Sequence, residues 1–310
     1  MKLISKCLSG VAGIALMLSG APAFAEGTAK PASAASEKLV APSGPARPAL
    51  WKLSDPDTTI YLFGTVHILP KGINWLEGPV AKALDTSDIL ITEIPEADMA
   101  AMQGTVIKLA MLPKDKSLKT ILSAKDYAAM DSALKTYGVP SGAFDRLEPW
   151  FVAVTLSTLP LVKEGYGADS GAEALIQARS KEAKRPHEGL ETVEYQLGIF
   201  DSLPQDKQVK YLREVIKGLP KIKGQLNTMV KYWSAGNPEK LGQMITADQT
   251  DPALMAALLT NRNRNWAGWI KQRLDKPGTV FIAVGAGHLA GKNSVQSMLK
   301  KQGYTITRVQ

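Results

Sequence analysis

Short strand-like runs of apolar residues lie near the two ends of this chain, and longer helix-like repeats lie between them. The strand-like runs cover residues 59–63, 88–93 and 279–284, and a last run covers 304–309. Each of the first three contains three or more consecutive apolar residues, which is typical of strands buried in a sheet. We therefore expect a buried central β-sheet built from segments far apart in the sequence.

The middle of the chain has the 3.6-residue apolar period of helices. We predict helices at residues 76–85, 97–112, 124–137, 149–162, 170–184, 205–234 and 252–274. Ser123 with Asp126 forms a capping-box-like start for one of them, Gly138 is its stop signal, and Pro220 should kink or divide the 205–234 stretch. The predicted fold class is α/β: a central β-sheet with flanking helices and a large helical insertion.

The first 25 residues have the layout of a cleavable secretory signal. Lys2 and Lys6 precede an apolar stretch over residues 8–18, and the small-residue sequence Ala23-Phe24-Ala25 follows it. The stretch is too short to span a bilayer, so we expect no stable membrane span after cleavage. Residues 26–49, rich in Ala, Pro, Ser, Gly and Lys, are predicted to be a flexible linker, and residues 50–310 a single domain. An exported protein, periplasmic or secreted, is the expectation.

Composition narrows the chemistry that is possible. The only cysteine, Cys7, would be lost on cleavage, so disulfides are excluded and a metal site would need His, Asp, Glu or Asn ligands. The formal charge of +8 over 310 residues is spread among acidic residues, without a basic block or aromatic-interleaved stripe. We therefore expect no nucleic-acid partner.

Two of the three histidines occupy the same frame: Gly64-Thr-Val-His67 and Gly285-Ala-Gly-His288 each end a predicted buried strand. A glycine there lets the chain turn without a Cβ clash, and the histidine then projects over the carboxyl edge of the sheet, where ligands bind in open α/β folds. Glu93 ends the 88–93 run in the same way. A single histidine of this kind is usually structural, but the repetition with a strand-end glutamate favours a functional site.

An arginine interrupts an apolar helical stripe near the end of the chain. Steps of four from Leu254 lead through Leu258, Arg262, Trp266 and Ile270, so the Arg262 side chain is expected to be buried with an anionic partner. That partner could be Glu93, another carboxylate or a substrate oxyanion, and a buried structural ion pair and a substrate clamp stay open as alternatives. Asn263, which steps from Leu259 to Ala267, is expected to face inward on the same helix.

Three other features have simpler interpretations. His187 lacks the strand–glycine frame and is expected to be structural or exposed, and Trp266 with Trp269 is expected to be core. Glu148, just before a proline that starts a helix, is expected to be a favourable N-terminal charge.

The pattern resembles the TraB/PrgY/GumN family, to which the TIKI metalloproteases belong and which is related to the erythromycin-esterase/ChaN-like fold. The resemblance covers about residues 51–309 and is carried by LFGTVH, LITEIP, LEPWF, GLETVEYQL, NRNRNWAGWI and FIAVGAGHLAGKNSVQSMLKKQGYTITRV. It implies a metal-dependent hydrolase site, peptide-cleaving in TIKI-like members. His67 and His288 would be metal ligands or catalytic imidazoles, Glu93 a ligand or general base, and Arg262 with Asn263 polar support.

Two histidines and a carboxylate with an open position can hold a divalent ion that activates water, and Mn, Co, Zn and Fe all suit such ligands. The leading hypothesis is therefore an exported metallohydrolase acting on a peptide or other small substrate. A metal-independent, esterase-like hydrolase using histidine, glutamate and arginine is one alternative. A non-catalytic binding protein for a peptide, haem or metal is another. The sequence leaves the substrate and the oligomeric state open.

Overall fold

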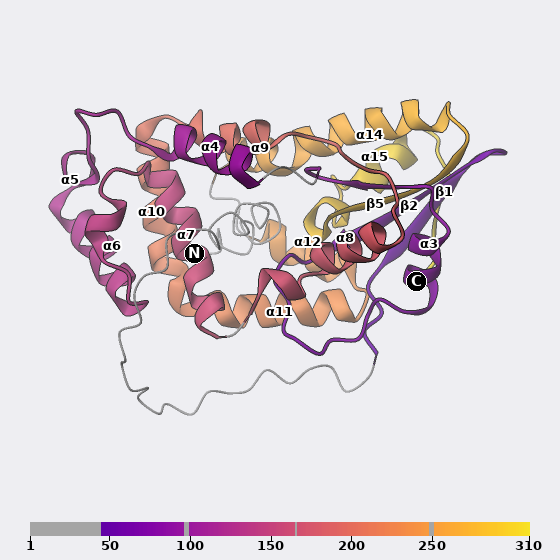
Figure 1. Ribbon diagram of the computed structural model, residues 1–310, viewed down its shortest axis with the longest axis horizontal. Coiled ribbons are helices and arrows are strands. Elements are labelled where there is room, and N and C mark those ends of the chain that lie inside the picture. The colour runs from indigo at the N-terminus through magenta and orange to yellow at the C-terminus, as the bar shows by residue number, and fades with distance from the viewer. Residues whose placement is uncertain (1–44, 96–98, 165, 248–250) are drawn as a thin grey trace.

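A mixed β-sheet lies at one end of the molecule (Figure 1). The computed structural model describes residues 45–95, 99–164, 166–247 and 251–310, and in this part six strands follow the order β4-β3-β5-β2-β1-β6. The strands are β1 (Leu50–Ser54), β2 (Thr58–Thr65), β3 (Ile89–Thr92), β4 (His187–Gly189), β5 (Gly278–Gly285) and β6 (Ile306–Arg308). Strands β2, β5, β3 and β4 run parallel, whereas β1 pairs antiparallel with both β2 and β6.

The central strand β5 is buried on both faces, as its continuous apolar run predicts. Phe281 and Ala283 belong to the larger core, while Ile282 packs with Trp266 and Ile270 on the opposite face. Helices α14 (Asn261–Leu274) and α15 (Val295–Lys301) cover that second face, and α3 (Gly78–Asp85), α8 (Ala172–Glu182) and α11 (Ile222–Ser234) lie on the other (Figure 1).

A large helical insertion separates the strands, as predicted. Between β3 and β4 lie α4 (Met99–Ala110), α5 (Leu118–Ile121), α6 (Ala124–Thr136), α7 (Pro149–Lys163) and α8, with 3₁₀ turns at Ser141–Phe144 and Ala168–Ser170. Between β4 and β5 lie α9 (Val193–Asp201), α10 (Gln205–Gly218), α11, α12 (Pro238–Thr246), α13 (Pro252–Met255) and α14. Figure 1 shows α5, α6, α7 and α10 at the far end from the sheet.

The predicted stop and start signals are confirmed. The Ser123 hydroxyl accepts the Asp126 N–H at the start of α6, and Gly138 has a φ of 74° just after its end. Pro220 divides the 205–234 stretch, because a 3₁₀ turn over Leu219–Lys221 separates α10 from α11.

The predicted 252–274 helix is not regular throughout. After α13, residues Ala256–Thr260 form a π-helical segment before α14 begins at Asn261. Such wide turns are rare and frequently occur at functional sites. This one ends two residues before Arg262.

Two strands and several short helices were not predicted. β4 has only three residues and no large apolar side chain, so the strand period cannot be recognised in it. Helices α5, α9, α12 and α15 have between four and nine residues. Helices α9, α12 and α15 each begin with a capping side chain that accepts a backbone N–H, from Thr192, Asn237 and Ser294 respectively. These cap residues were the signal that the sequence offered.

The predicted signal segment and most of the predicted linker lie outside the described residues. Within the described part, the Ala46 N–H already donates to the Asn74 carbonyl at 2.9 Å, and the Arg47 N–H donates to the Ser234 carbonyl. Across the described residues, no helix has the length and apolar character that a membrane crossing requires.

Gly64, the first motif glycine, is required by a close approach of two backbones. A Cβ on Gly64 would lie 3.0 Å from the Ala286 Cα and 3.1 Å from its Cβ. The Gly64 carbonyl also accepts the indole N–H of Trp233 at 2.7 Å, and that ring packs edge-on against Phe63 and Trp75. The glycine therefore sets the distance between the ends of β2 and β5.

We predict that Gly64→Ala destabilises the protein by about 1–3 kcal/mol, because the added methyl overpacks the contact with Ala286. The matched control is Gly224→Ala in α11, where an added Cβ meets nothing within 4 Å. That change should stabilise by roughly 0.5–1 kcal/mol, since alanine favours a helix interior. Urea unfolding of both variants measures this difference. Equal stabilities would contradict the role assigned to the close approach.

Candidate active site

Three polar side chains reach the same edge of the sheet from three parallel strands. His67 lies two residues beyond β2, Glu93 directly follows β3, and His288 lies in the 3₁₀ turn Ala286–Leu289 after β5. This is the carboxyl edge, where open α/β sheets bind ligands. All three side chains are buried, with exposed fractions of 4%, 4% and 0%. Burial without water requires a polar partner for each of them.

Glu93 has partners on both oxygens. Oε1 accepts the Gly285 backbone N–H at 2.7 Å, and Oε2 accepts Arg262 Nη2 at 2.6 Å and Gln196 Nε2 at 3.0 Å. Burial by itself would raise the Glu93 pKa. The Arg262 charge, His288, His67 and the Gly285 N–H together lower it to about 2. The second motif glycine, Gly285, thus contributes a backbone donor that holds the carboxylate.

Arg262 uses all five of its N–H groups. Nε contacts Glu191 at 3.0 Å, and Nη2 donates to Glu191 at 2.7 Å and to Glu93. Nη1 donates to the Leu258 carbonyl and to His288 Nε2, both at 3.1 Å. The guanidinium is fully buried, and the two carboxylates raise its pKa despite that burial. Because a guanidinium has five donors, none is left here for a substrate. This geometry favours the buried ion pair over the substrate clamp.

Glu191 is a member of this network that was not predicted. It follows the unrecognised strand β4 and accepts the Arg262 fork as well as the Trp266 indole N–H at 2.9 Å. Gln196 bridges the two carboxylates, since its Nε2 lies 3.0 Å from both Glu191 and Glu93. Glu191 stands after β4 much as Glu93 stands after β3, so recognition of β4 would have identified it.

The network fixes the tautomer of His288. Arginine can only donate, so His288 Nε2 accepts the Arg262 N–H and Nδ1 carries the proton. Nδ1 lies 2.6 Å from Asn263 Oδ1, and the Asn263 amide donates to the Asn293 carbonyl at 2.7 Å. Burial and the Arg262 charge lower the His288 pKa to about 3. The ring also lies against Trp266, with centroids 4.3 Å apart. His288 is therefore a neutral imidazole at physiological pH.

His67 has a different environment. Its Nδ1 lies 2.9 Å from Glu173 Oε2 as an ion-pair contact, and its buried Nε2 has no hydrogen-bond partner among the described residues. Glu173 stands in the first turn of α8, which is tied to the motif by a bond from the Ala172 N–H to the Val66 carbonyl. Burial lowers the His67 pKa, but Glu173 and Glu93 outweigh it and raise the pKa above 6.5. Sequence reasoning missed Glu173.

The remaining candidates lie outside this constellation or in its packing shell. His187 begins β4 at the sheet and its Nε2 lies 2.7 Å from Thr92 Oγ1, so its role is structural. Trp266 belongs to the core and contacts His288, whereas Trp269 is only partly buried. Glu148 occupies the N-cap position of α7 without a side-chain capping bond, and burial followed by the Asp201 charge raises its pKa.

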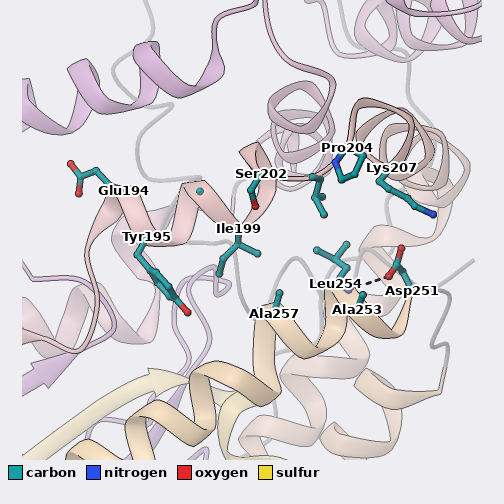
Figure 2. Close-up of a pocket in the computed structure, with 12 residues that line it drawn as sticks. Glu194, Tyr195, Ile199, Ser202, Pro204, Lys207, Asp251, Ala253, Leu254 and Ala257 are labelled. Atoms are coloured by element: carbon teal, nitrogen blue, oxygen red, sulfur yellow. Dashed lines mark hydrogen bonds between the residues drawn. The ribbon is translucent and has the colours of Figure 1, made fainter.

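Two cavities among the described residues are candidate binding sites. The first is an apolar trough with a volume of about 600 Å³. Figure 2 shows Tyr195 and Ile199 of α9 facing Leu254 and Ala257 across it. None of the charged side chains at positions 93, 191 and 262 lines this trough.

The second cavity is a more polar cleft of about 820 Å³ between α12 and the segment after β5. It is lined by Asn263 and Gly287. Since Asn263 contacts His288 Nδ1, the polar cleft is the cavity that touches the network.

The predicted metal ligands do not fit a divalent ion in this arrangement. His288 Nε2 and Glu93 Oε2 both accept N–H groups of Arg262, so a fixed cation already occupies their lone pairs. Over the described ranges, no three His, Cys, Asp or Glu side chains are grouped to hold a metal. Among the predicted ligands, His67 Nε2 is a ring nitrogen without a hydrogen-bond partner in the described part of the chain, so its lone pair could bind a metal. Metal ligation by His67, His288 and Glu93 stays a prediction.

Fold and site together define an α/β protein with a buried histidine–glutamate–arginine network at the carboxyl edge of its parallel strands. The chain belongs to the TraB/PrgY/gumN family, whose model matches residues 49–308. The family predicted from the motifs is thus confirmed.

Curated relatives differ in what their names state. The chain is 26% identical to the uncharacterized protein YbaP of Escherichia coli (strain K12), over 77% of this chain and 87% of that protein. It is 21% identical to an uncharacterized protein of Treponema pallidum (strain Nichols), over 81% and 80%. It is 22% identical to the metalloprotease TIKI homolog of Amphimedon queenslandica, over 84% of this chain but 61% of that longer protein. No solved structure matches the chain.

We predict that Glu191→Gln destabilises the protein by about 3–5 kcal/mol, because it leaves the buried guanidinium with one carboxylate in place of two. Glu188→Gln, an exposed position in β4, is the matched control and should change stability by less than about 0.5 kcal/mol. Chemical denaturation of both variants gives the comparison. A Glu191→Gln protein as stable as its control would mean that the ion pair contributes little.

Proposed function

We propose that this chain is a hydrolase that cleaves a carbonyl-linked bond, the amide of a peptide or a related ester, with His67 as general base. The observation that carries the proposal is His67 itself. The Glu173 carboxylate lies 2.9 Å from Nδ1 and raises the His67 pKa, and the buried Nε2 has no hydrogen-bond partner among the described residues.

The His67–Glu173 pair supplies the proton transfer. Glu173 orients the imidazole and stabilises its protonated form. His67 Nε2 removes a proton from a water molecule as the water oxygen attacks the carbonyl carbon. The same nitrogen then delivers that proton to the leaving nitrogen or oxygen as its bond to carbon breaks. Water and substrate are the only reactants, so this chemistry balances without a further component.

Arg262 supports this base without touching substrate. It keeps Glu93 ionised, and the Glu93 charge raises the His67 pKa, while the Arg262 charge itself lowers that pKa. It also holds His288 neutral through a fixed hydrogen bond to Nε2. Arg262 and Asn263 are positioning residues in this proposal.

We place the substrate in the polar cleft, because Asn263 and Gly287 line it and Asn263 contacts His288. His67 is buried and does not line this cleft, so the proposal requires the substrate to reach Nε2 from it. Its mixed polar and apolar lining suits a peptide backbone with side chains. Export to the periplasm or the cell exterior is part of the same proposal and rests on the sequence of residues 1–25.

A metal-dependent form of the hydrolase is the second candidate. The names of the TIKI relatives favour it, and so does the free Nε2 of the buried His67. His288 and Glu93 could join His67 as ligands only if Arg262 released them. Chelator sensitivity of turnover separates this candidate from the metal-independent one.

The first test is cleavage of the oxidised B chain of insulin by the purified mature protein, with mass spectrometry identifying new termini. We predict that His67→Ala lowers kcat/KM by about 10²–10⁴, the usual contribution of a general base. Glu173→Gln removes the charge that raises the His67 pKa, so the acid limb of the rate profile should move to lower pH. A general base is active only when it is deprotonated, so the rate rises as pH increases through its pKa. A lower His67 pKa therefore moves this rise to lower pH.

Circular dichroism serves as the folding control for both variants. Binding of the peptide without any cleavage, by wild type and variants alike, would point to a binding protein. Cleavage that survives in a folded His67→Ala variant would overturn the proposed role.

We also predict that Gln243→Trp, on the exposed surface of α12 in the polar cleft, raises KM by about tenfold, equivalent to roughly 1.4 kcal/mol. Lys207→Trp, which crowds the apolar trough, is the matched control and should leave KM unchanged. The reverse pattern would assign the substrate to the trough.

A further inference from the structure

We infer that Arg262 is a resident cation that holds the ligand set a divalent metal would need, so that guanidinium and metal compete for the same atoms. This goes beyond the proposed function, because it concerns what the buried site can bind and not which bond it cleaves.

The contacts of Arg262 carry the inference. Its N–H groups engage both oxygens of Glu191, one oxygen of Glu93 and Nε2 of His288. These are carboxylate and imidazole atoms, the ligand types of manganese, cobalt, zinc and iron sites. A metal ion on them would have to displace N–H donors that lie between 2.6 and 3.1 Å away.

Charge reinforces this competition. The guanidinium is fully buried and stacks on Trp266, with its carbon 4.8 Å from the ring centroid. A divalent ion beside it would meet a fixed positive charge in a medium that screens poorly. With the guanidinium removed, Glu93 and Glu191 would be two buried carboxylates without a cation, a strong attractor for metal.

The test is cobalt binding by wild type and Arg262→Met, a neutral side chain of similar length that suits the apolar stripe. Each protein is dialysed against cobalt(II) chloride, and elemental analysis and the visible d–d absorption are measured. The expected result is one cobalt ion per chain in the variant, with affinity on the order of 100-fold above that of wild type. Arg264→Met, at an exposed arginine on the same helix, is the matched control and should behave as wild type.

The ligands are checked by Arg262→Met/His288→Ala, which should lose the absorption bands of the single variant. If Arg262→Met is unfolded without metal, cobalt should restore a cooperative unfolding transition, because the ion replaces the lost cation. Three results would overturn the inference: wild type that binds cobalt as tightly as the variant, a variant that binds none, or an unfolded variant that cobalt does not restore. The readout is independent of turnover, so any of these leaves the hydrolase proposal standing.

Discussion

The ion pair between Arg262 and the carboxylates Glu93 and Glu191 is the interaction on which the rest of the site depends. Three charged groups are removed from water there, and such burial stabilises a protein only if every donor and acceptor is satisfied. The five donors of the guanidinium meet two carboxylates, one carbonyl and one imidazole nitrogen. Four separate segments of the chain must therefore come together before the arginine can be buried.

This requirement explains how the sheet and the helical insertion are joined. Glu93 comes from the end of β3, Glu191 from the loop after β4, and His288 from the turn after β5. Arg262 comes from α14, just after the π-helical segment, and its Nη1 bonds the Leu258 carbonyl within that segment. The π-helical segment and Arg262 are coupled, because the Leu258 carbonyl in that segment accepts a hydrogen bond from the arginine side chain. Burial of Arg262 therefore connects the ends of β3, β4 and β5 to helix α14 at the carboxyl edge of the sheet, where open α/β folds bind ligands.

The sequence was sufficient to predict the central parallel strands β2, β3 and β5 and the residues that interrupt apolar patterns. Glu93 and Arg262 were identified because a charge in an apolar frame demands a partner, and the two histidines because glycine frames a strand end. Neither Glu191 nor Glu173 ends a predicted strand, so the pattern that identified Glu93 did not apply to them. Their roles depend on β4 and on the start of α8, which are placed by packing against β3 and the 66–67 backbone. Pairings over such separations cannot be read from local periodicity.

The repeated glycine–histidine motif suggests equivalent histidines, but the environments make them unequal. His288 faces an arginine and an asparagine, which fix a neutral ring with a pKa of about 3. His67 faces a glutamate, which raises its pKa and leaves Nε2 without a partner. Groups whose pKa values are pushed apart by their surroundings can serve different roles in one site. The same motif thus places a neutral, hydrogen-bonded imidazole at one strand end and an imidazole with a raised pKa at the other, and the difference arises from which charge lies opposite each ring.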